Sequence, residues 1–431
     1  MSAERRDSPK IVVVGAGIGG LSTALSLEAA GFTDVTVVES CPRLRPVGAG
    51  INLQPSAVRE LTELGLGPAL AAEAVATRRL EYHHRFGGVI WSEPRGRAAG
   101  YRWPQYSVHR GRLQSILLRE VCRRLGRRSL VTGWRLHHYE QRCRGGRTEV
   151  LAHGTGDAGP LVCDLLVGAD GVNSAVRATM YPGEGPPLAN GIHMWRGVSR
   201  QPAFLDGRTM LIIGCNSRVK AVVYPVTPPD ASGMCALNWV VEAHDPRPVE
   251  PSGDWDAAAR PETVLDHLAG WHNPCLDLHR VVRAAPRVLC YPMIDRDPRP
   301  TWVDGRVVLL GDAAHPMYPT GSNGASQAVV DARVLAHQLA LHPLDEALSR
   351  FDGIRRPETG RLLAAHRRLE PDALLRQVEI LAPHGFSDIR RVLPEDKLAD
   401  ISSCTRRVTG TDAAGLNARS SWNAPARTAS R

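Results

Sequence analysis

The sequence predicts an α/β fold in which a domain with a parallel sheet is interrupted by an antiparallel β-sheet insert and followed by helices. Three observations predict this fold. Residues 10–39 run from strand through a glycine-rich turn to helix and strand, as a βαβ unit does. Residues 190–245 contain alternating strand runs separated by turns, which is typical of an antiparallel sheet. Residues 343–400 are rich in helix-forming patterns.

The composition agrees with a folded chain of two or three domains. The chain has 431 residues, of which 43% are hydrophobic, so it is long and apolar enough for more than one core. Its formal net charge is +9, and Lys10, Lys220 and Lys397 are its only lysines. We interpret the excess of arginine as a compositional bias, because no basic stripe interleaved with aromatic residues predicts a nucleic-acid partner.

The cysteines and the apolar runs indicate the cellular compartment of the protein. Nine cysteines, an odd number, form no C-x-x-C pair, which favours reduced thiols in a cytoplasm over a disulfide framework or a zinc site. The apolar run after Lys10 is too short for a signal peptide, and no segment reaches ~18 apolar residues. We therefore expect no membrane partner, and no metal, since no H-E-x-x-H or other metal-spaced cluster occurs.

The first βαβ unit contains a dinucleotide-binding pattern. GAGIGG matches G-x-G-x-x-G at Gly15, Gly17 and Gly20. In such a loop the first glycine permits the tight turn, the second lets backbone approach a pyrophosphate, and the third lets helix and strand pack closely. Glu39 ends the second strand, where a carboxylate accepts hydrogen bonds from ribose hydroxyls and repels a 2′-phosphate. The pattern predicts a Rossmann-like domain that binds FAD or NAD, but not NADP.

Two later junctions place an acid and glycines at the end of a strand. GADGVNSAVR (168–177) follows a buried strand and precedes a helix. GDAAHPMYPTGSNGASQ (311–327) also stands between a strand and a helix. Taken alone, Asp170 is explained by a turn and Asp312 by a helix cap.

In this order, GAGIGG, GADGVNSAVR and GDAAHPMYP resemble the single-component FAD-dependent aromatic hydroxylases of the p-hydroxybenzoate and salicylate hydroxylase type. The likeness spans roughly residues 10–360. Stretches such as GAGINLQPSAVRELTELGLG and HPMYPTGSNGASQAVVD are also similar to 5-methylphenazine-1-carboxylate 1-monooxygenases, which perform a decarboxylative hydroxylation with FAD and NADH. The resemblance implies a p-hydroxybenzoate hydroxylase-like fold with FAD as cofactor.

The resemblance also implies roles for individual residues. Asp312 would bind ribityl or ribose hydroxyls of FAD, and Asp170 with Gly171 would lie beside the pyrophosphate. The helix that starts near Gly324 would stabilise the anionic reduced flavin through its dipole. Many relatives have an asparagine where this chain has Ser326. The other FAD-binding residues that we expect are Ala16, Ile18, Gly19, Ser40, Arg45, Gly48, Arg110, Gln114, Val131, Pro319, Gly321, Asn323 and Ala325.

These patterns predict domain boundaries. We expect an FAD-binding domain formed by residues 1–80, 106–185 and 285–360. A β-rich substrate domain should comprise residues 81–105 and 186–284. We expect C-terminal helices over 361–404 and a disordered tail over 405–431, which is polar, small and basic.

The chemistry that the resemblance implies is carried by the flavin. NAD(P)H reduces it, O2 then forms a C4a-hydroperoxide, and an electron-rich phenazine, pyridine or phenol ring is hydroxylated. We therefore assign no catalytic side chain, and we expect His315 to buttress its loop. Arg196 either holds a substrate carboxylate or pairs with an acid. Residues for which a pocket wall and core packing are equal alternatives are Trp195, Tyr224, Trp239, Tyr291, Met293 and Met317.

Three alternatives share the fold. A flavin-dependent halogenase would show a Gly-Trp-x-Trp-x-Ile-Pro segment, which the sequence lacks. An amine oxidase or simple dehydrogenase would lack the paired motifs at 168–177 and 311–324 in this form. A non-catalytic flavin-binding protein stays open, as do the choice of NADH or NADPH, the exact substrate, and a monomeric or homo-oligomeric state.

Overall fold

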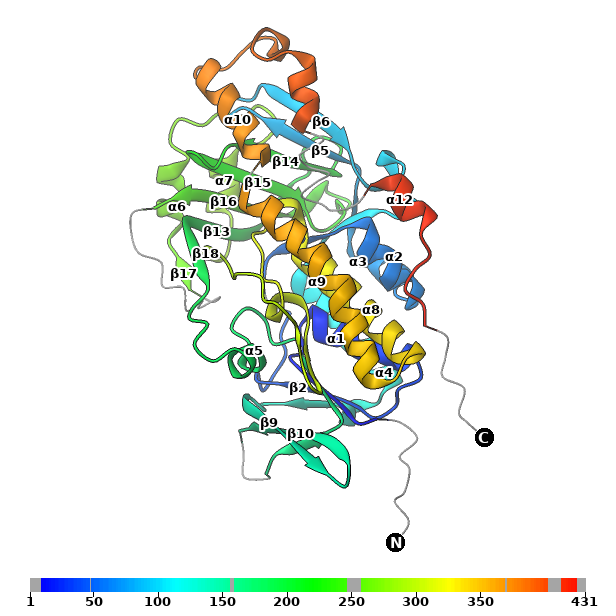
Figure 1. Ribbon diagram of the computed structural model, residues 1–431. Coiled ribbons are helices and arrows are strands. Elements are labelled where there is room, and N and C mark those ends of the chain that lie inside the picture. Colours follow the sequence, from blue (N-terminus) through cyan, green and yellow to red (C-terminus); the bar gives the residue numbers. More distant parts are fainter. Residues whose placement is uncertain are drawn as a thin grey trace.

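The computed structural model describes residues 9–46, 48–155, 159–245, 257–368, 370–401 and 412–424. Figure 1 shows two parts of the molecule. The lower part is built around α1 and α8, and the upper part is β-rich and carries α6, α7 and α10. A long helix, α9, runs along both parts.

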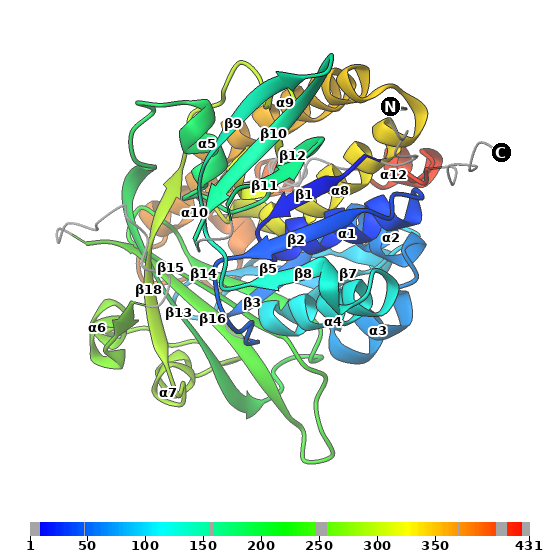
Figure 2. The ribbon, with the colours of Figure 1, turned by 90° about the horizontal axis from the view of Figure 1, so that it is seen from below.

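A six-stranded sheet forms the centre of the first part. Its strand order is β19-β20-β12-β1-β2-β8, and all neighbours are parallel except β19 and β20. Figure 2 shows β1 and β2 beside α1, with β8 and α4 next to them. The inner strands β1, β2, β12 and β20 are buried on both faces, as parallel strands under helices should be, whereas the edge strands β8 and β19 are partly exposed. Their bounds are Ile11–Val14 (β1), Val35–Glu39 (β2), Leu130–Thr132 (β8), Leu165–Gly168 (β12), Val303–Asp304 (β19) and Val307–Leu309 (β20).

Helices cover this sheet and carry its motifs. Helix α1 packs against both α4 and α8, so its surface is buried almost all round. A small antiparallel sheet, β3-β7-β4, lies beside these helices and leads into α2 and α4. The bounds are Ile18–Ala29 (α1), Gly50–Leu53 (β3), Pro55–Glu63 (α2), Gly67–Glu73 (α3), Val75–Thr77 (β4), Gln105–His109 (β7), Arg110–Arg124 (α4), Ala175–Met180 (α5) and Gly324–Leu341 (α8).

An eight-stranded sheet forms the β-rich part, in the order β17-β18-β13-β16-β15-β14-β5-β6. Helices α6 and α7 pack on one face around Trp239, and α10 packs on the other. The predicted insert is present, and its sheet extends beyond the predicted bounds: β18 pairs with β13 after residue 284, and β5, which pairs with β14, begins two residues before residue 81. The bounds are Arg79–His83 (β5), Val89–Pro94 (β6), Leu188–Pro202 (β13), Thr209–Gly214 (β14), Val219–Pro225 (β15), Met234–His244 (β16), Ala258–Ala259 (β17), Pro261–His267 (α6), Leu278–Arg283 (α7) and Val288–Asp295 (β18).

A three-stranded antiparallel sheet, which we did not predict, lies at the edge of the first part. Its strands are β9 (Leu136–Arg144), β10 (Arg147–Gly154) and β11 (Leu161–Cys163). Charged residues interrupt these runs, so their alternation is weaker than in the insert.

The C-terminal region is helical over α9 (Leu344–Arg368) and α10 (Glu370–Leu381), and α12 covers Ala413–Ala418. The disorder that we expected for the tail does not hold for 412–424. Arg59, which is buried, donates to the Leu416 carbonyl at 3.3 Å and to the Arg419 carbonyl at 2.8 Å, so the chain docks beside α2. The rest of the expected tail, 405–411 and 425–431, lies outside the described residues.

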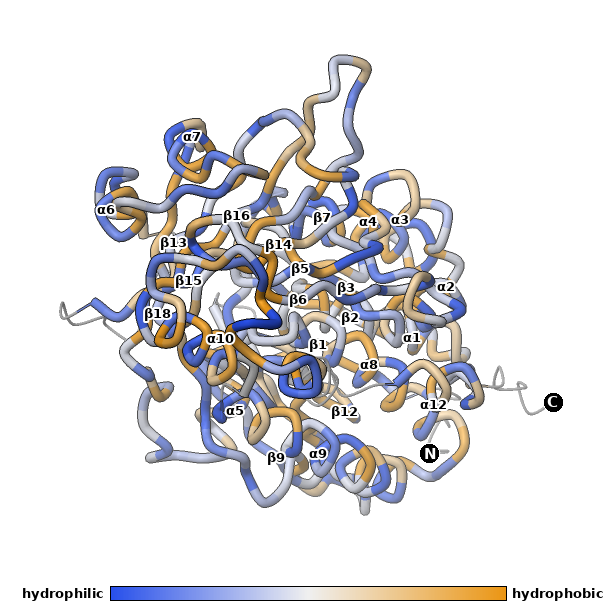
Figure 3. The backbone as a smooth tube through the Cα atoms, turned by 90° about the horizontal axis from the view of Figure 1, so that it is seen from above, coloured by the Kyte–Doolittle hydropathy of each residue, from blue (hydrophilic) through white to orange (hydrophobic). Residues whose placement is uncertain are grey.

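Hydropathy follows this architecture. Figure 3 shows hydrophobic segments mostly on the strands and helices towards the middle, and hydrophilic ones mostly on the loops around the rim. None of the helices in the described part of the chain combines the length and apolarity that a membrane crossing requires.

Candidate functional site

The predicted motifs meet at one edge of the six-stranded sheet. Strands β2, β1, β12 and β20 are consecutive neighbours. Strand β2 ends at Glu39 and β1 ends at the glycine loop. Strand β12 ends at the turn of Asp170, and β20 ends shortly before Asp312. Because the carboxyl ends of parallel strands face the same way, segments nearly 300 residues apart line one crevice, where α/β folds bind their ligands.

The glycine loop fits a pyrophosphate in the way the pattern predicts. A Cβ atom added at Gly20 would lie 1.9 Å from the Gly15 carbonyl oxygen, and one added at Gly15 would lie 2.5 Å from that of Ala169. Both positions therefore require glycine for close backbone packing. A Cβ atom added at Gly17 would meet nothing within 4 Å, so this position faces open space in front of α1.

The second strand brings its carboxylate back to this loop. Glu39 accepts a hydrogen bond from the Ala16 amide at 2.9 Å, and Gln114 donates to the Ala16 carbonyl at 2.8 Å. Val131 pairs with Val38, next to Glu39. Four predicted residues are thus brought together at the end where the adenosine half is expected. Ser40 and Arg45 are exposed on the following loop.

The second motif is a helix cap as well as part of the crevice. Asp170 accepts hydrogen bonds from the Ser174 hydroxyl at 2.5 Å and the Ala175 amide at 2.8 Å. Arg177, which is buried, donates to Glu184 and to the carbonyls of Ala313 and Ala314, at 3.1 and 2.7 Å. This arginine ties the second motif to the third, although the sequence analysis assigned it no role.

Asp312 is exposed to solvent, but many protein atoms lie around its carboxyl group. Burial raises its pKa, and the nearby charges of His315 and Arg110 partly offset this. A carboxyl that is deep in the protein and yet faces an opening can accept hydrogen bonds from a bound polyol. A Cβ atom added at Gly324, where α8 begins, would lie 3.6 Å from this carboxyl, so Asp312 and the helix N-terminus face the same space.

His315 supports its loop, as expected. Its Nε2 lies 2.6 Å from Asp331, which also accepts from the Gly311 amide at 2.9 Å and from Arg355 at 2.7 Å. Burial alone would raise the pKa of Asp331, but His315 and Arg355 lower it to about 2. Ser326, also buried, accepts from the Gln54 amide at 2.9 Å and therefore joins α8 to the β3–α2 turn.

These features together fit FAD. The glycine loop and Glu39 would hold the adenosine diphosphate half, and Asp312 would hold the ribityl chain. Gly48, Arg110 and the loop 319–324 lie along the same crevice; the side chain of Arg110 passes 3.5 Å from where a Gly48 Cβ atom would stand. When bound, FAD supplies the redox chemistry that the side chains of the site lack.

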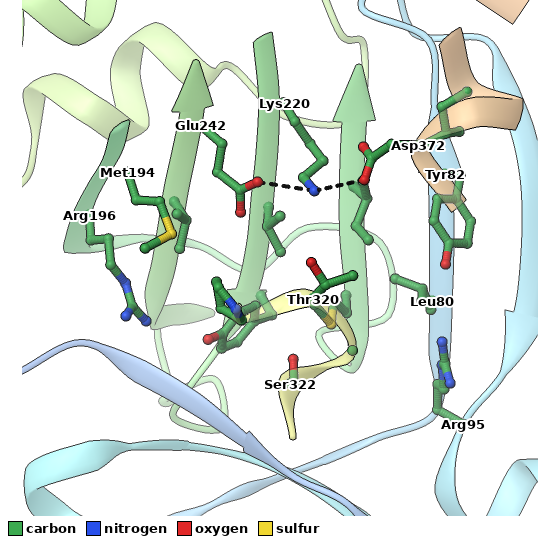
Figure 4. A pocket seen from close by; sticks show the side chains of 18 of the residues that line it. Leu80, Tyr82, Arg95, Met194, Arg196, Lys220, Glu242, Thr320, Ser322 and Asp372 are labelled. Atoms are coloured by element: carbon green, nitrogen blue, oxygen red, sulfur yellow. Dashed lines mark hydrogen bonds and ion pairs between the residues drawn. The ribbon is translucent and has the colours of Figure 1, made fainter. Parts of the chain in front are cut away.

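A pocket opens between the loop 319–322 and one face of the eight-stranded sheet (Figure 4). It encloses about 910 Å³, including space open to solvent. Its apolar wall is formed by Leu80, Met194, Met210, Ile212, Val222, Val240, Pro319 and Leu375. Its polar lining is formed by Gln54, Tyr82, Arg95, Gln105, Arg196, Lys220, Tyr224, Glu242, Thr320, Ser322 and Asp372.

Of the predicted wall residues, Arg196 and Tyr224 line this pocket. The lining of this pocket does not include Trp195, Trp239, Tyr291, Met293 or Met317, which favours the alternative of core packing for them. Neighbouring residues of a strand point to opposite faces. Arg196 faces the pocket, so Trp195 packs in the core on the other face, as Trp239 does. Tyr291 and Met293 pack behind Met194 and Val240.

Among the polar pocket residues that the sequence did not predict, three form a charged cluster. Lys220 lies 3.0 Å from Glu242 and 3.4 Å from Asp372. Lys220 and Glu242 are register partners on β15 and β16, whereas Asp372 comes from α10. The available signal was a charged residue in each of two otherwise apolar strands, AVVYPV and ALNWVV with their flanks.

The structure also gathers His138, Glu140 and His153, a group that could hold a metal and that the sequence spacing did not predict. Cross-strand pairing of β9 and β10 brings the histidines together. Their rings stack 4.5 Å apart and 4° from parallel, so their nitrogens do not point at one centre. The group is mostly exposed and does not belong to the pocket.

A family model described as "FAD binding domain" matches residues 9–190 and 295–352. The chain belongs to this family. A phenazine 1,6-dicarboxylic acid hydroxylase of Lysobacter antibioticus is 43% identical over 83% of this chain and 89% of its own length. A 3-amino-4-hydroxybenzoate 2-monooxygenase of Streptomyces cremeus is 34% identical over 84% and 86%, and a salicylate hydroxylase of Pseudomonas putida 30% identical over 82% and 83%.

Solved structures share the fold of this FAD binding domain protein. HpxO of Klebsiella pneumoniae, complexed with FAD and uric acid, has a TM-score of 0.74 at 24% identity, over 93% of this chain and 97% of that chain. A salicylate hydroxylase substrate complex has a TM-score of 0.70 at 22% identity, over 94% and 99%. Family and relatives together show an FAD-dependent aromatic monooxygenase. The rival enzyme classes are thereby set aside.

Proposed function

We propose that the substrate is an aromatic carboxylate and that Arg196 holds its carboxylate while the ring is hydroxylated. One observation carries the proposal: within the described part of the chain, Arg196 pairs with no acid, although it lines a pocket. Its Nη2 donates to the Gly50 carbonyl at 2.9 Å, and its Nε is buried without a hydrogen-bond partner. A buried donor of this kind needs an acceptor, which an anionic ligand supplies.

The surroundings of Arg196 support an orienting role. Burial raises the pKa of Tyr224 to about 12, although the adjacent Arg196 lowers it in part, so this phenol stays protonated and can donate. The apolar wall holds the flat ring and keeps water out, as the reaction requires. Bound FAD would supply the activation of O2, and the side chains need only orient the ring and exclude solvent.

The relatives' substrates have a common feature. A dicarboxylic phenazine, an aminohydroxybenzoate and salicylate are named for the three relatives above, and each is an aromatic acid. The pocket, at about 910 Å³ including space open to solvent, has room for one or more rings. Analysis of the reaction products gives the number of rings and shows whether CO2 is lost. Reduced cysteines further suggest a cytoplasmic enzyme.

The test is anaerobic stopped-flow reduction of the holoenzyme by NADH, with and without aromatic acids and their neutral carboxamides. We expect acids, but not carboxamides, to accelerate flavin reduction and to give hydroxylated products when O2 is added. In Arg196→Gln the acids should bind roughly 10- to 100-fold more weakly, as loss of a charge-assisted hydrogen bond predicts. Arg95→Gln is the matched control, because Arg95 lines the same pocket but is paired with Glu93 at 2.6 Å. Equal losses in both variants would refute the assignment.

A further inference from the structure

The end of the pocket opposite the loop 319–322 is closed by an acidic cluster built around one lysine (Figure 4). Lys220 stands between Glu242, at 3.0 Å, and Asp372, at 3.4 Å. The side chains are only 7%, 6% and 9% exposed. Three elements supply them: the neighbouring strands β15 and β16, and helix α10.

The charges of this cluster do not cancel. Two carboxylates share one ammonium, so the formal charge of the three side chains is negative. Burial would lower the pKa of Lys220, but Asp372 and Glu242 outweigh it and raise that pKa, which keeps the ammonium charged. Asp372 also accepts from the Asn216 amide at 3.2 Å, whereas Lys220 is the only partner that Glu242 has within the described residues.

The other end of the pocket has the opposite charge. Arg196 carries a positive charge that no acid in the described part of the chain neutralises, while Arg95 is paired with Glu93. An uncompensated negative charge and an uncompensated positive charge therefore line the same face of the sheet, separated by the apolar side chains of Met194 and Val240. Because buried charges are costly unless paired, the ligand that suits this pocket is itself bipolar.

We propose that Glu242 and Asp372 form a second subsite, which binds a hydrogen-bond donor or a cationic group on the ring edge remote from the carboxylate. An aromatic amine, a protonated ring nitrogen or a phenol would satisfy it. The inference rests on the proposed function, because it takes the carboxylate at Arg196 as the other anchor. It narrows the substrate class from aromatic acids to aromatic acids with a distal donor.

The test compares ligands that differ only in the donor. Holoenzyme is titrated with 4-aminosalicylate and 4-methylsalicylate, and with 6-amino- and 6-methyl-2-naphthoate, and the change in flavin absorbance gives each Kd. Only one of the two ring sizes should match the substrate, so we expect the preference in one pair, the salicylates or the naphthoates. In that pair, wild type should bind the amino compound about tenfold more tightly than the methyl compound, as one hydrogen bond to a charged group predicts. In Glu242→Gln and Asp372→Asn that ratio should fall towards one, with the Kd of the methyl member little changed.

A carboxylate on the same helix provides the matched control. Glu379 of α10 pairs with His84 and Arg85 and lies outside the pocket lining. Glu379→Gln should therefore retain the preference, which separates docking of α10 from charge in the pocket. If either pocket variant misfolds, the other still reports, since they come from different elements.

The possible failures differ. If the acids bind and are hydroxylated but wild type shows no preference for the amino member, or if both variants retain that preference, the second subsite is wrong and the proposed function stands. If no aromatic acid binds or accelerates flavin reduction, the proposed function fails, and this inference fails with it.

Discussion

Alanine at Gly17 and at Gly20 should give opposite results, although both glycines belong to one motif. An added Cβ atom at Gly20 would lie 1.9 Å from the Gly15 carbonyl oxygen, whereas real Cβ atoms essentially never come closer than 3.0 Å to another heavy atom. That oxygen belongs to the backbone, so the loop or α1 must move. Overpacking of this kind costs about 1–3 kcal/mol or more.

Gly17 has no such neighbour. Nothing lies within 4 Å of an added Cβ atom, and the backbone at φ −74° and ψ −174° suits any residue. Gly17→Ala should therefore leave the stability of the FAD-free protein unchanged. The methyl group would instead occupy the space in front of the loop, where the pyrophosphate is held. Loss of one charge-assisted hydrogen bond there, about 1.5–3 kcal/mol, weakens FAD binding roughly 10- to 150-fold.

Two assays separate these effects. Thermal unfolding of the FAD-free proteins, followed by circular dichroism, should show a Tm lower by roughly 1–3 °C for Gly20→Ala and unchanged for Gly17→Ala. Quenching of flavin fluorescence gives the Kd for FAD. If Gly17→Ala binds FAD as wild type does, the loop does not approach the pyrophosphate. If Gly20→Ala keeps its Tm, the close packing of α1 on the loop is not as described.

Three further predictions concern the network behind the crevice and the C-terminal segment. Asp331→Asn should lower the free energy of unfolding by about 3–5 kcal/mol in urea titrations, because Arg355, at 0% exposure, loses a buried carboxylate; an unchanged midpoint would contradict this. The pKa of Asp331 is lowered to about 2 from an unfolded value of about 4, so its stabilisation is complete above pH ~4 and is lost as the pH falls towards 2; the unfolding free energy of wild type should fall more steeply than that of Asp331→Asn over this range. Removal of residues 412–431 deletes the two carbonyl acceptors of buried Arg59 and should cost about 1–3 kcal/mol, whereas the Kd of pocket ligands should not change, since none of the residues described in this segment, 412–424, lines the pocket.

The cofactor crevice could be predicted because its signals are local. Each motif is a strand, a glycine-containing turn and a helix that follow one another in sequence, and parallel strands place such turns on one edge. The pairing of Glu39 with Ala16 follows from that arrangement. The bond from Arg177 to the third motif does not, because 136 residues separate it from Ala313 and no local pattern indicates its partner.

The aromatic wall could not be predicted, because side-chain direction depends on register. On β13, a change of one residue decides whether Trp195 or Arg196 faces the pocket. Pairing with β16 and β18 sets that choice, and turn lengths alone do not reveal it. Large aromatic residues bury the most apolar area, so Trp195 and Trp239 belong to the core face and leave the apolar wall of the pocket to methionines, aliphatic residues and Pro319.

The position of Asp372 has a consequence for how specificity varies. The family model ends at residue 352, beyond which α10 supplies Asp372 and Leu375 to the pocket. The crevice for FAD is built entirely from residues before that point, so it does not depend on which side chains α10 carries. Substitutions in one C-terminal helix can therefore change the charge at the distal end of the pocket, while the residues that would hold FAD stay the same. A helix that offers no carboxylate would leave Lys220 and Glu242 as a neutral ion pair, so this end of the pocket would lose the excess negative charge that favours a donor.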